Sequence, residues 1–166
     1  MNTLKYFLKY IYYYFTAVDK HGIHSPFVFQ LYTTVIQTKK FCYNRRKKNN
    51  ELISRLFTHF EPKIVVEIGS HRLSKKSMTY HQDFKNLKKS LSDFIFIHKS
   101  TKENLNNALK YMHNDSVLVI NDIHQSKEQW QFLQNHSKVN LSINLFEIGL
   151  IFFREQQEEQ HFTIRF

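Results

Sequence analysis

Two short stretches hold side chains whose types and spacing could do chemistry. In the first, Glu67, Gly69 and Ser70 end an apolar run, and in the second, Asp122 and His124 end another. A carboxylate can accept hydrogen bonds from a ligand, and a neutral imidazole can act as a general base near neutral pH. Both stretches can serve one site only if the fold brings the two strand ends to the same edge of a sheet.

The first stretch has the sequence EPKIVVEIGS over residues 61–70. Its apolar residues predict a buried strand, and Gly69 predicts a tight turn where a side chain would clash. In an open α/β sheet, ligands bind at the carboxyl ends of the strands. Glu67, Gly69 and Ser70 are therefore candidate ligand-binding residues, although the segment that follows them is basic and contains no second glycine.

The remaining patterns predict alternating helices and strands. In chain order they are a helix over 51–60, an amphipathic helix over 74–91, a strand within 92–100, a helix over 104–113, a strand within 115–124, a helix over 127–135, and a C-terminal strand followed by an antiparallel hairpin with turns at Gly149 and 155–160. Helical connections between short buried strands predict parallel pairing through right-handed crossovers.

The N-terminus predicts an amphipathic helix over residues 4–18, followed by a second helix that begins at Ser25 and Pro26. The expected apolar face of the first helix is Leu4, Phe7, Leu8, Ile11, Tyr12 and Phe15. Two interpretations stay open for this face. It either packs on its own domain, or it lies on an acidic bilayer or a partner protein.

The densest basic segment runs from Lys39 to Lys48, in a chain of formal net charge +10. It is either a solvated connector or a patch that contacts the phosphates of nucleic acid or another acidic surface. We expect residues 1–50 to form a helical extension with this connector, and residues 51–166 to form the α/β domain.

The 166 residues suit one core of ordinary size. The single cysteine, Cys42, cannot form an intramolecular disulfide or a cysteine-based zinc site, which fits a reducing compartment, and we expect a cytoplasmic protein. No stretch reaches the roughly 18 apolar residues of a transmembrane segment. We expect no metal site.

The strands ending in EIGS, FIFIHKS and VLVINDIH, together with an antiparallel C-terminal pair, resemble class I S-adenosylmethionine-dependent methyltransferases. The resemblance is closer to a bacterial group with a KHG-x-HSPFVF segment, here Lys20–Phe29, and with endings like INLFEIGLIFFR and HFTIRF. It implies a three-layer Rossmann-like fold with a reduced, mostly parallel sheet, a C-terminal antiparallel hairpin and preceding N-terminal helices.

The resemblance also implies roles for the candidate residues. Glu67, Gly69 and Ser70 would hold the amino-acid end of S-adenosylmethionine, and Asp122 with His124 would orient the nucleophile of an unknown acceptor. The chain departs from the family pattern because bulky residues 71–73 follow the turn, and because no acidic residue is evident to bind the ribose hydroxyls.

The connection after Gly69 has about twenty residues, enough for one crossover helix but not for two further strands. The first strand would then be a sheet edge, to be covered by a homodimer or by the N-terminal helices. The expected function is a methyltransferase-like protein with lost or weakened cofactor binding. The alternatives are an active methyltransferase and a basic adaptor for nucleic acid or a membrane surface.

Overall fold

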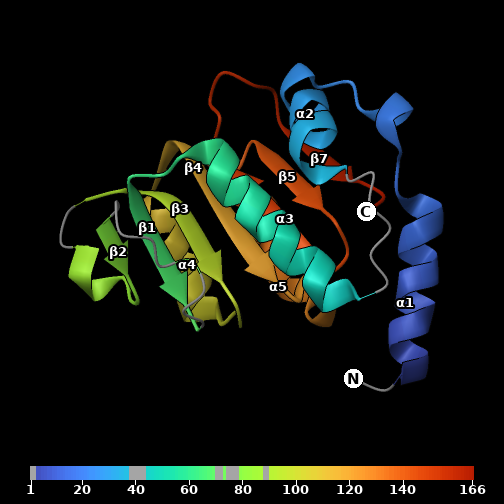
Figure 1. Ribbon diagram of the computed structural model, residues 1–166, viewed down its shortest axis with the longest axis horizontal. Helices are drawn as coiled ribbons and strands as arrows, with labels where there is room; N and C mark the ends of the chain where they lie inside the picture. The colour runs from blue at the N-terminus through green and yellow to red at the C-terminus, as the bar shows by residue number, and fades with distance from the viewer. Residues whose placement is uncertain (1–2, 38–43, 70–72, 74–78, 88–89) are drawn as a thin grey trace.

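A single sheet with helices on both faces forms the body of the molecule (Figure 1). The computed structural model describes residues 3–37, 44–69, 73, 79–87 and 90–166. The helical elements are α1 (Thr3–Thr16), η1 (Lys20–Gly22), α2 (Pro26–Leu31), the π-turn η2 (Tyr32–Ile36), α3 (Arg45–Phe60), η3 (Lys85–Leu87), α4 (Lys102–Tyr111), η4 (Ile123–Gln125) and α5 (Lys127–Gln134). The strands are β1 (Ile64–Ile68), β2 (Thr79–His81), β3 (Ser92–Ile97), β4 (Met112–Asn121), β5 (Leu141–Asn144), β6 (Ile148–Phe152) and β7 (Gln160–Thr163).

Within the described residues, the strands lie in the order β2-β1-β3-β4-β6-β5-β7. The pairs β1·β2, β1·β3, β3·β4 and β5·β7 are parallel, whereas β6 is antiparallel to both β4 and β5. The sheet is thus mostly parallel, and β6 is the antiparallel strand, placed between β4 and β5. The expected α/β class and Rossmann-like arrangement are confirmed.

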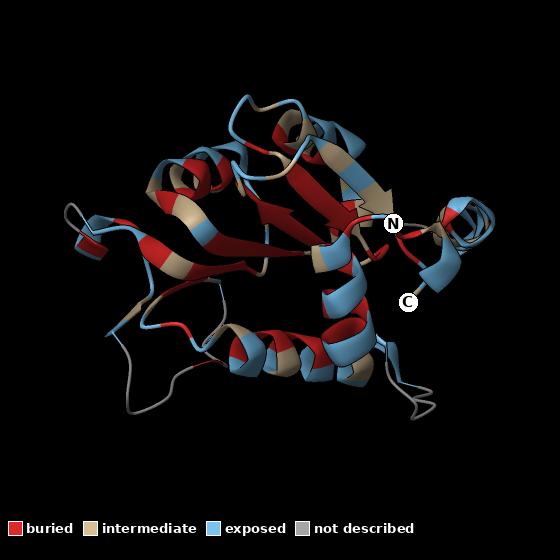
Figure 2. Ribbon diagram, turned by 90° about the horizontal axis from the view of Figure 1, so that it is seen from above, coloured by how far each residue is buried: buried red, intermediate tan, exposed pale blue. Residues whose placement is uncertain are grey.

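The central strands are buried on both faces, as their unbroken apolar runs predict. Along β3, Phe94 and Phe96 pack in the layer of α2 and α3, whereas Ile95 and Ile97 pack in the layer of α4 and α5. Figure 2 shows the sheet between these helical layers, with its central strands coloured mostly as buried. The sheet and the two helical layers thus form a three-layer core, in which alternate residues of β3 face opposite layers.

The second N-terminal helix begins as expected. The Ser25 hydroxyl accepts from the Val28 amide at 3.4 Å, and Pro26 occupies the first turn of α2. By contrast, α3 begins at Arg45, capped by the Asn44 side chain, and not at residue 51. The second half of the expected connector is therefore helical, because the Asn44 cap starts the helix within the basic run; residues 39–43 lie outside the described residues.

The orientation of α1 differs from the expectation that its leucine and phenylalanine face packs on its own domain. Tyr13 and Ala17 are the buried residues of this segment, each 5% exposed, whereas Phe15 is 80% exposed. The Tyr13 hydroxyl donates to the Ile164 carbonyl and accepts from the Phe166 amide at 3.1 Å. A tyrosine face binds the domain because it can also satisfy backbone groups at the C-terminus.

The expected helix over 74–91 is wrong for its described part. Residues 79–81 form β2, which pairs in parallel with β1, and residues 85–87 form a single 3-10 turn. Four residues of this helix were expected to face inward. Phe84 and Leu87 are buried, because a spacing of three also suits a 3-10 turn, whereas Leu91 is 44% exposed and Met78 lies outside the described residues. With β2 in place, β1 lies inside the sheet, and the predicted exposed edge at β1 is wrong.

The antiparallel hairpin was predicted to have its turn at residues 155–160, but the structure forms it from the two preceding strands. It joins β5 to β6 through residues 145–147, where Phe146 has a φ of 72°, while β7 pairs in parallel with β5. Gly149 lies inside β6 and is not a turn. A Cβ at this position would lie 2.4 Å from the Trp130 ring, so the glycine is needed for close packing of α5 on the sheet.

Candidate functional site

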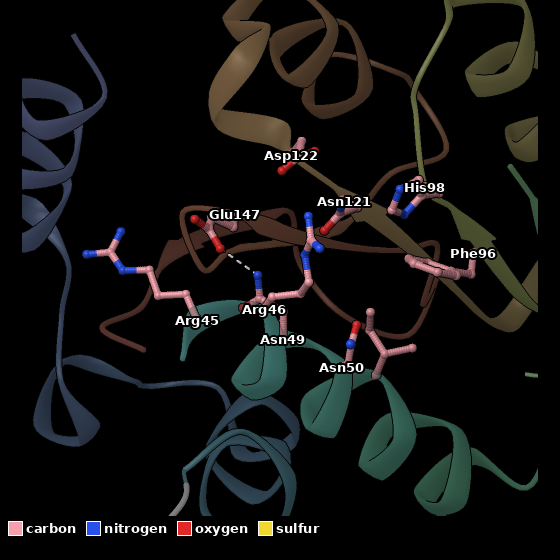
Figure 3. A pocket seen from close by; sticks show the side chains of 10 residues that line it. Arg45, Arg46, Asn49, Asn50, Phe96, His98, Asn121, Asp122 and Glu147 are labelled. Atoms are coloured by element: carbon pink, nitrogen blue, oxygen red, sulfur yellow. Dashed lines mark hydrogen bonds between the residues drawn. The ribbon is translucent and has the colours of Figure 1, made fainter. Parts of the chain in front are cut away.

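Polar side chains converge on a cavity of about 340 Å³ at the carboxyl ends of β3 and β4 (Figure 3). Parallel strands direct their carboxyl ends to one edge of the sheet, and ligands bind in such crevices. The lining residues come from α3, β3, β4 and the β5–β6 turn, and they are Arg45, Arg46, Asn49, Asn50, Ile53, Phe96, His98, Asn121, Asp122 and Glu147.

Asp122 is the predicted site residue that the structure places in this cavity. It follows β4 in the left-handed conformation, with φ 58° and ψ 32°, so the chain turns sharply into η4. Within the described part of the chain its carboxylate makes no hydrogen bond. Burial raises the pKa of Asp122 and Glu147 adds to this, while His124 and other nearby cationic groups oppose the shift. The carboxylate is thus available to a ligand.

Glu147 is held in place by two helices that are far from it in sequence. Its carboxylate accepts a hydrogen bond from Nδ2 of the Asn49 side chain at 2.5 Å and another from the Tyr6 hydroxyl. Arg45 donates to the same Tyr6 hydroxyl and lies 4.2 Å from the ring centroid of Tyr10. These contacts tie α1, α3 and the β5–β6 turn together at one end of the cavity.

The two arginines at the start of α3 point in different directions. In Figure 3, Arg46 points toward Asn121, whereas Arg45 points away toward α1. His98, directly after β3, lies on the opposite wall of the cavity. Arg46, His98 and Asn121 supply donors, and Asp122 supplies an acceptor, so the cavity can bind a ligand with groups of both kinds.

His124, predicted to act with Asp122, lies in a different setting. Its ring stacks on Phe146 at 5.0 Å and meets the edge of Tyr6 at 5.3 Å, and its Nδ1 is buried with no hydrogen-bond partner among the described residues. Burial lowers the pKa of His124. It lines a separate groove of about 530 Å³ beside α1, so the structure does not bring Asp122 and His124 into one cavity.

The predicted cofactor-binding residues lie at the end of β1. Gly69 has a φ of 84°, which confirms the tight turn, whereas Ser70 lies outside the described residues. The Glu67 carboxylate is fully buried and accepts from the Leu73 amide at 3.0 Å and the Tyr80 hydroxyl at 2.8 Å. Glu67 is therefore bonded within the protein to two groups of the segment that follows the turn.

Asp83 is an acidic residue that the sequence interpretation missed. It comes two residues after β2, next to the strand that carries Glu67, and it is exposed. Its Oδ1 accepts from the Asn86 amide at 3.0 Å, which caps the 3-10 turn. The available signal was a strand-forming Thr-Tyr pair followed by a capping aspartate, which argues against one continuous helix.

Arg46, Asn49 and Glu147 were also missed as residues of the cavity. Arg46 was assigned to the basic segment, and Asn49 was not singled out. An acidic residue inside the apolar run that forms β5 and β6 was the only local signal for Glu147. Within the described residues, no group of three histidine, cysteine, aspartate or glutamate side chains could hold a metal ion.

The fold and the cavity define a class: a Rossmann-like α/β protein with a polar cavity at the carboxyl edge of its parallel strands. Comparison of the chain with protein-family models and with curated proteins found no match.

Proposed function

We propose that this protein is methyltransferase-like, related to class I S-adenosylmethionine-dependent methyltransferases, with lost or weakened cofactor binding. We further propose that its cavity beside Asp122 binds a small polar molecule. The observation that carries the proposal is the convergence of His98, Asn121 and Asp122 at the ends of neighbouring parallel strands, beside the Gly69 turn of β1. Ligands of open α/β sheets bind at this edge.

Weak cofactor binding is argued from the surroundings of Glu67. Its carboxylate binds the Leu73 amide, and the Leu73 side chain is 8% exposed within the main core. The segment after the turn is thus fastened to the sheet at this point. A cofactor that used these groups would break their buried hydrogen bonds. Each buried group that loses its partner in this way costs about 1–3 kcal/mol.

The ligand chemistry is argued from the cavity walls. Arg46 and His98 favour an acidic group, and Asp122 with Glu147 favours a hydroxyl or amine. Phe96 and Ile53 provide an apolar wall. A small molecule with an acidic end and a hydroxyl or amino group matches these features.

Calorimetric titration with S-adenosylmethionine and S-adenosylhomocysteine tests the cofactor part. We expect no binding, or binding only at high ligand concentration. Tight stoichiometric binding would overturn the proposal. The cavity part is tested by screening small polar acids by thermal shift, where a stabilising compound should lose its effect in Asp122→Ala and keep it in Asp115→Ala, a change of an exposed aspartate outside the cavity.

An active methyltransferase is the second candidate, and Asp83 favours it. Its position after β2 is where the resemblance places an acidic residue for the ribose hydroxyls. In that case Asp83→Ala should weaken S-adenosylmethionine binding, and Asp122→Ala should reduce transfer to the acceptor. Transfer that is unchanged in Asp122→Ala would remove Asp122 from the site.

A basic adaptor is the third candidate, supported by the lysines and arginines in the first turn of α3. Binding to nucleic acid that is insensitive to salt would argue against it.

The single cysteine supports a reducing compartment, and we propose the cytoplasm. A homodimer also stays a proposal, which sedimentation of the purified chain would test.

A further inference from the structure

The side of α1 that faces away from the domain is apolar and largely exposed in the described part of the chain. Leu4, Phe7, Leu8 and Phe15 are 63%, 55%, 58% and 80% exposed. Large side chains of this kind, gathered along one helix, are a mark of an interaction site. We call these four residues the outer face of α1.

The geometry of the helix keeps the outer face away from the protein. Successive residues of an α-helix are turned by about 100°, so Leu4 and Phe15 project almost opposite to Tyr13. Tyr13 is 5% exposed against the domain. Figure 2 shows α1 at the margin of the molecule with most of its surface coloured as exposed. The described residues of the domain hold one side of α1 and leave the other side largely exposed.

The surroundings of the outer face are cationic. α1 contains Lys5 and Lys9 and no acidic residue. On the flank of the helix, Arg165 lies 4.5 Å from the ring centroid of Tyr14 while donating to backbone carbonyls of the α1 segment. The acidic side chain that contacts α1 in the described structure, Glu147, is already bonded to Tyr6.

The groove beside α1 extends the same surface. It shares Leu8 and Tyr12 with the exposed side of the helix, and its wall includes Trp130. Lys127 also lines it. Lys9 at the groove donates to the His124 carbonyl at 2.7 Å, whereas Lys127 is exposed. Apolar side chains next to exposed lysines are the combination that interfacial helices present to acidic lipids.

We propose that the outer face of α1 docks on the surface of an anionic lipid bilayer, with the helix lying in the plane of the interface. The charge distribution favours this partner over a second copy of the chain, because two copies would bring like-charged rims together. No helix in the described part of the chain is long and apolar enough to cross a membrane, so contact with the surface is the geometry that fits.

Co-sedimentation of the full chain with vesicles tests this proposal. Vesicles of phosphatidylcholine with phosphatidylserine should bind the protein, vesicles of phosphatidylcholine alone should bind it much less, and added salt should weaken binding. The double variant Phe7→Gln, Phe15→Gln should lower the partition coefficient by about tenfold or more, because two exposed rings no longer enter the interface. Lys5→Glu should lower it by about fivefold.

The matched control is Phe29→Gln, which removes a phenylalanine that is 44% exposed on α2. Its binding should equal that of the unchanged protein. Equal binding to both vesicle types, no binding, or an unaffected double variant would each overturn the proposal. It would also be overturned if the double variant abolished a dimer of the chain while vesicles bound neither form.

Discussion

Gly149 shows how a single missing side chain sets the distance between α5 and the sheet. A Cβ there would lie 2.4 Å from Trp130 and 2.9 Å from Ile123. We expect Gly149→Ala to lower the free energy of unfolding by about 2 kcal/mol, because a well-packed core cannot absorb the extra carbon without strain. Chemical denaturation measures this loss.

The same substitution in a Trp130→Leu background provides the control. The smaller side chain leaves room for the new methyl group, so the alanine should then be less destabilising than it is alone. Equal losses in both backgrounds would show that the ring contact is not the cause.

His124 predicts a pH-dependent stability at the scale of one residue. Burial lowers its pKa; Asp122 and Glu147 oppose this shift, and Lys9 and Arg45 add to it. The unfolded state therefore binds a proton more readily than the folded state. Above a pH of about 6.5, protonation of His124 does not change the free energy of unfolding; as the pH falls below this value, it lowers the free energy of unfolding.

His124→Phe removes this titration and keeps the ring contacts. Relative to the unchanged protein, its unfolding free energy should rise more at a pH of about 5.5 than at about 7.5. Repeating the comparison in Asp122→Asn separates the effect from titration of that carboxyl. A gain that is the same at both pH values would contradict the lowered pKa.

At the scale of elements, Tyr13 fastens α1 to the rest of the molecule. It is buried and hydrogen-bonded to the C-terminal residues, whereas its neighbour Tyr12 is 74% exposed. We expect Tyr13→Ser to release α1 as a locally unfolding unit, since few other buried groups hold this helix. Hydrogen exchange should show faster exchange of the α1 amides by about tenfold or more, with β3 and β4 unchanged.

Tyr12→Ser is a closely matched control for this release. It removes the same aromatic ring from the same helix, at a position that does not contact the core. Its exchange pattern should resemble that of the unchanged protein. Equal exchange of α1 in the two variants would show that another contact attaches the helix.

At the scale of the whole molecule, the formal net charge of +10 predicts binding to polyanions. Affinity for a single-stranded oligonucleotide should fall with added salt, and Lys47→Glu should reduce the slope of log affinity against log salt by about one. Lys102→Glu carries the same change of charge on α4, against the opposite face of the sheet from α3. Equal effects of the two variants would mean that only net charge matters and that α3 forms no distinct patch.

How much could be predicted from sequence depended on how local the determining interactions are. The runs of β1, β3 and β4, the helix start at Ser25 and the turn at Gly69 were all predicted correctly, since each depends on neighbours within a few residues. Three-residue β2 was missed because so short a strand shows no clear alternation, and its pairing with β1 depends on a remote partner.

The sequence by itself determined the α/β class and the placement of Asp122 at a strand end. Both depend on the pattern of apolar and polar residues within a short segment of the chain. Only the tertiary structure decided which side of α1 faces the domain, that Glu67 is enclosed, and that Asp122 shares a cavity with Glu147 and not with His124. The physical reason is distance along the chain. The bond between Tyr6 and Glu147 spans 141 residues, and no local pattern of either segment encodes such a contact.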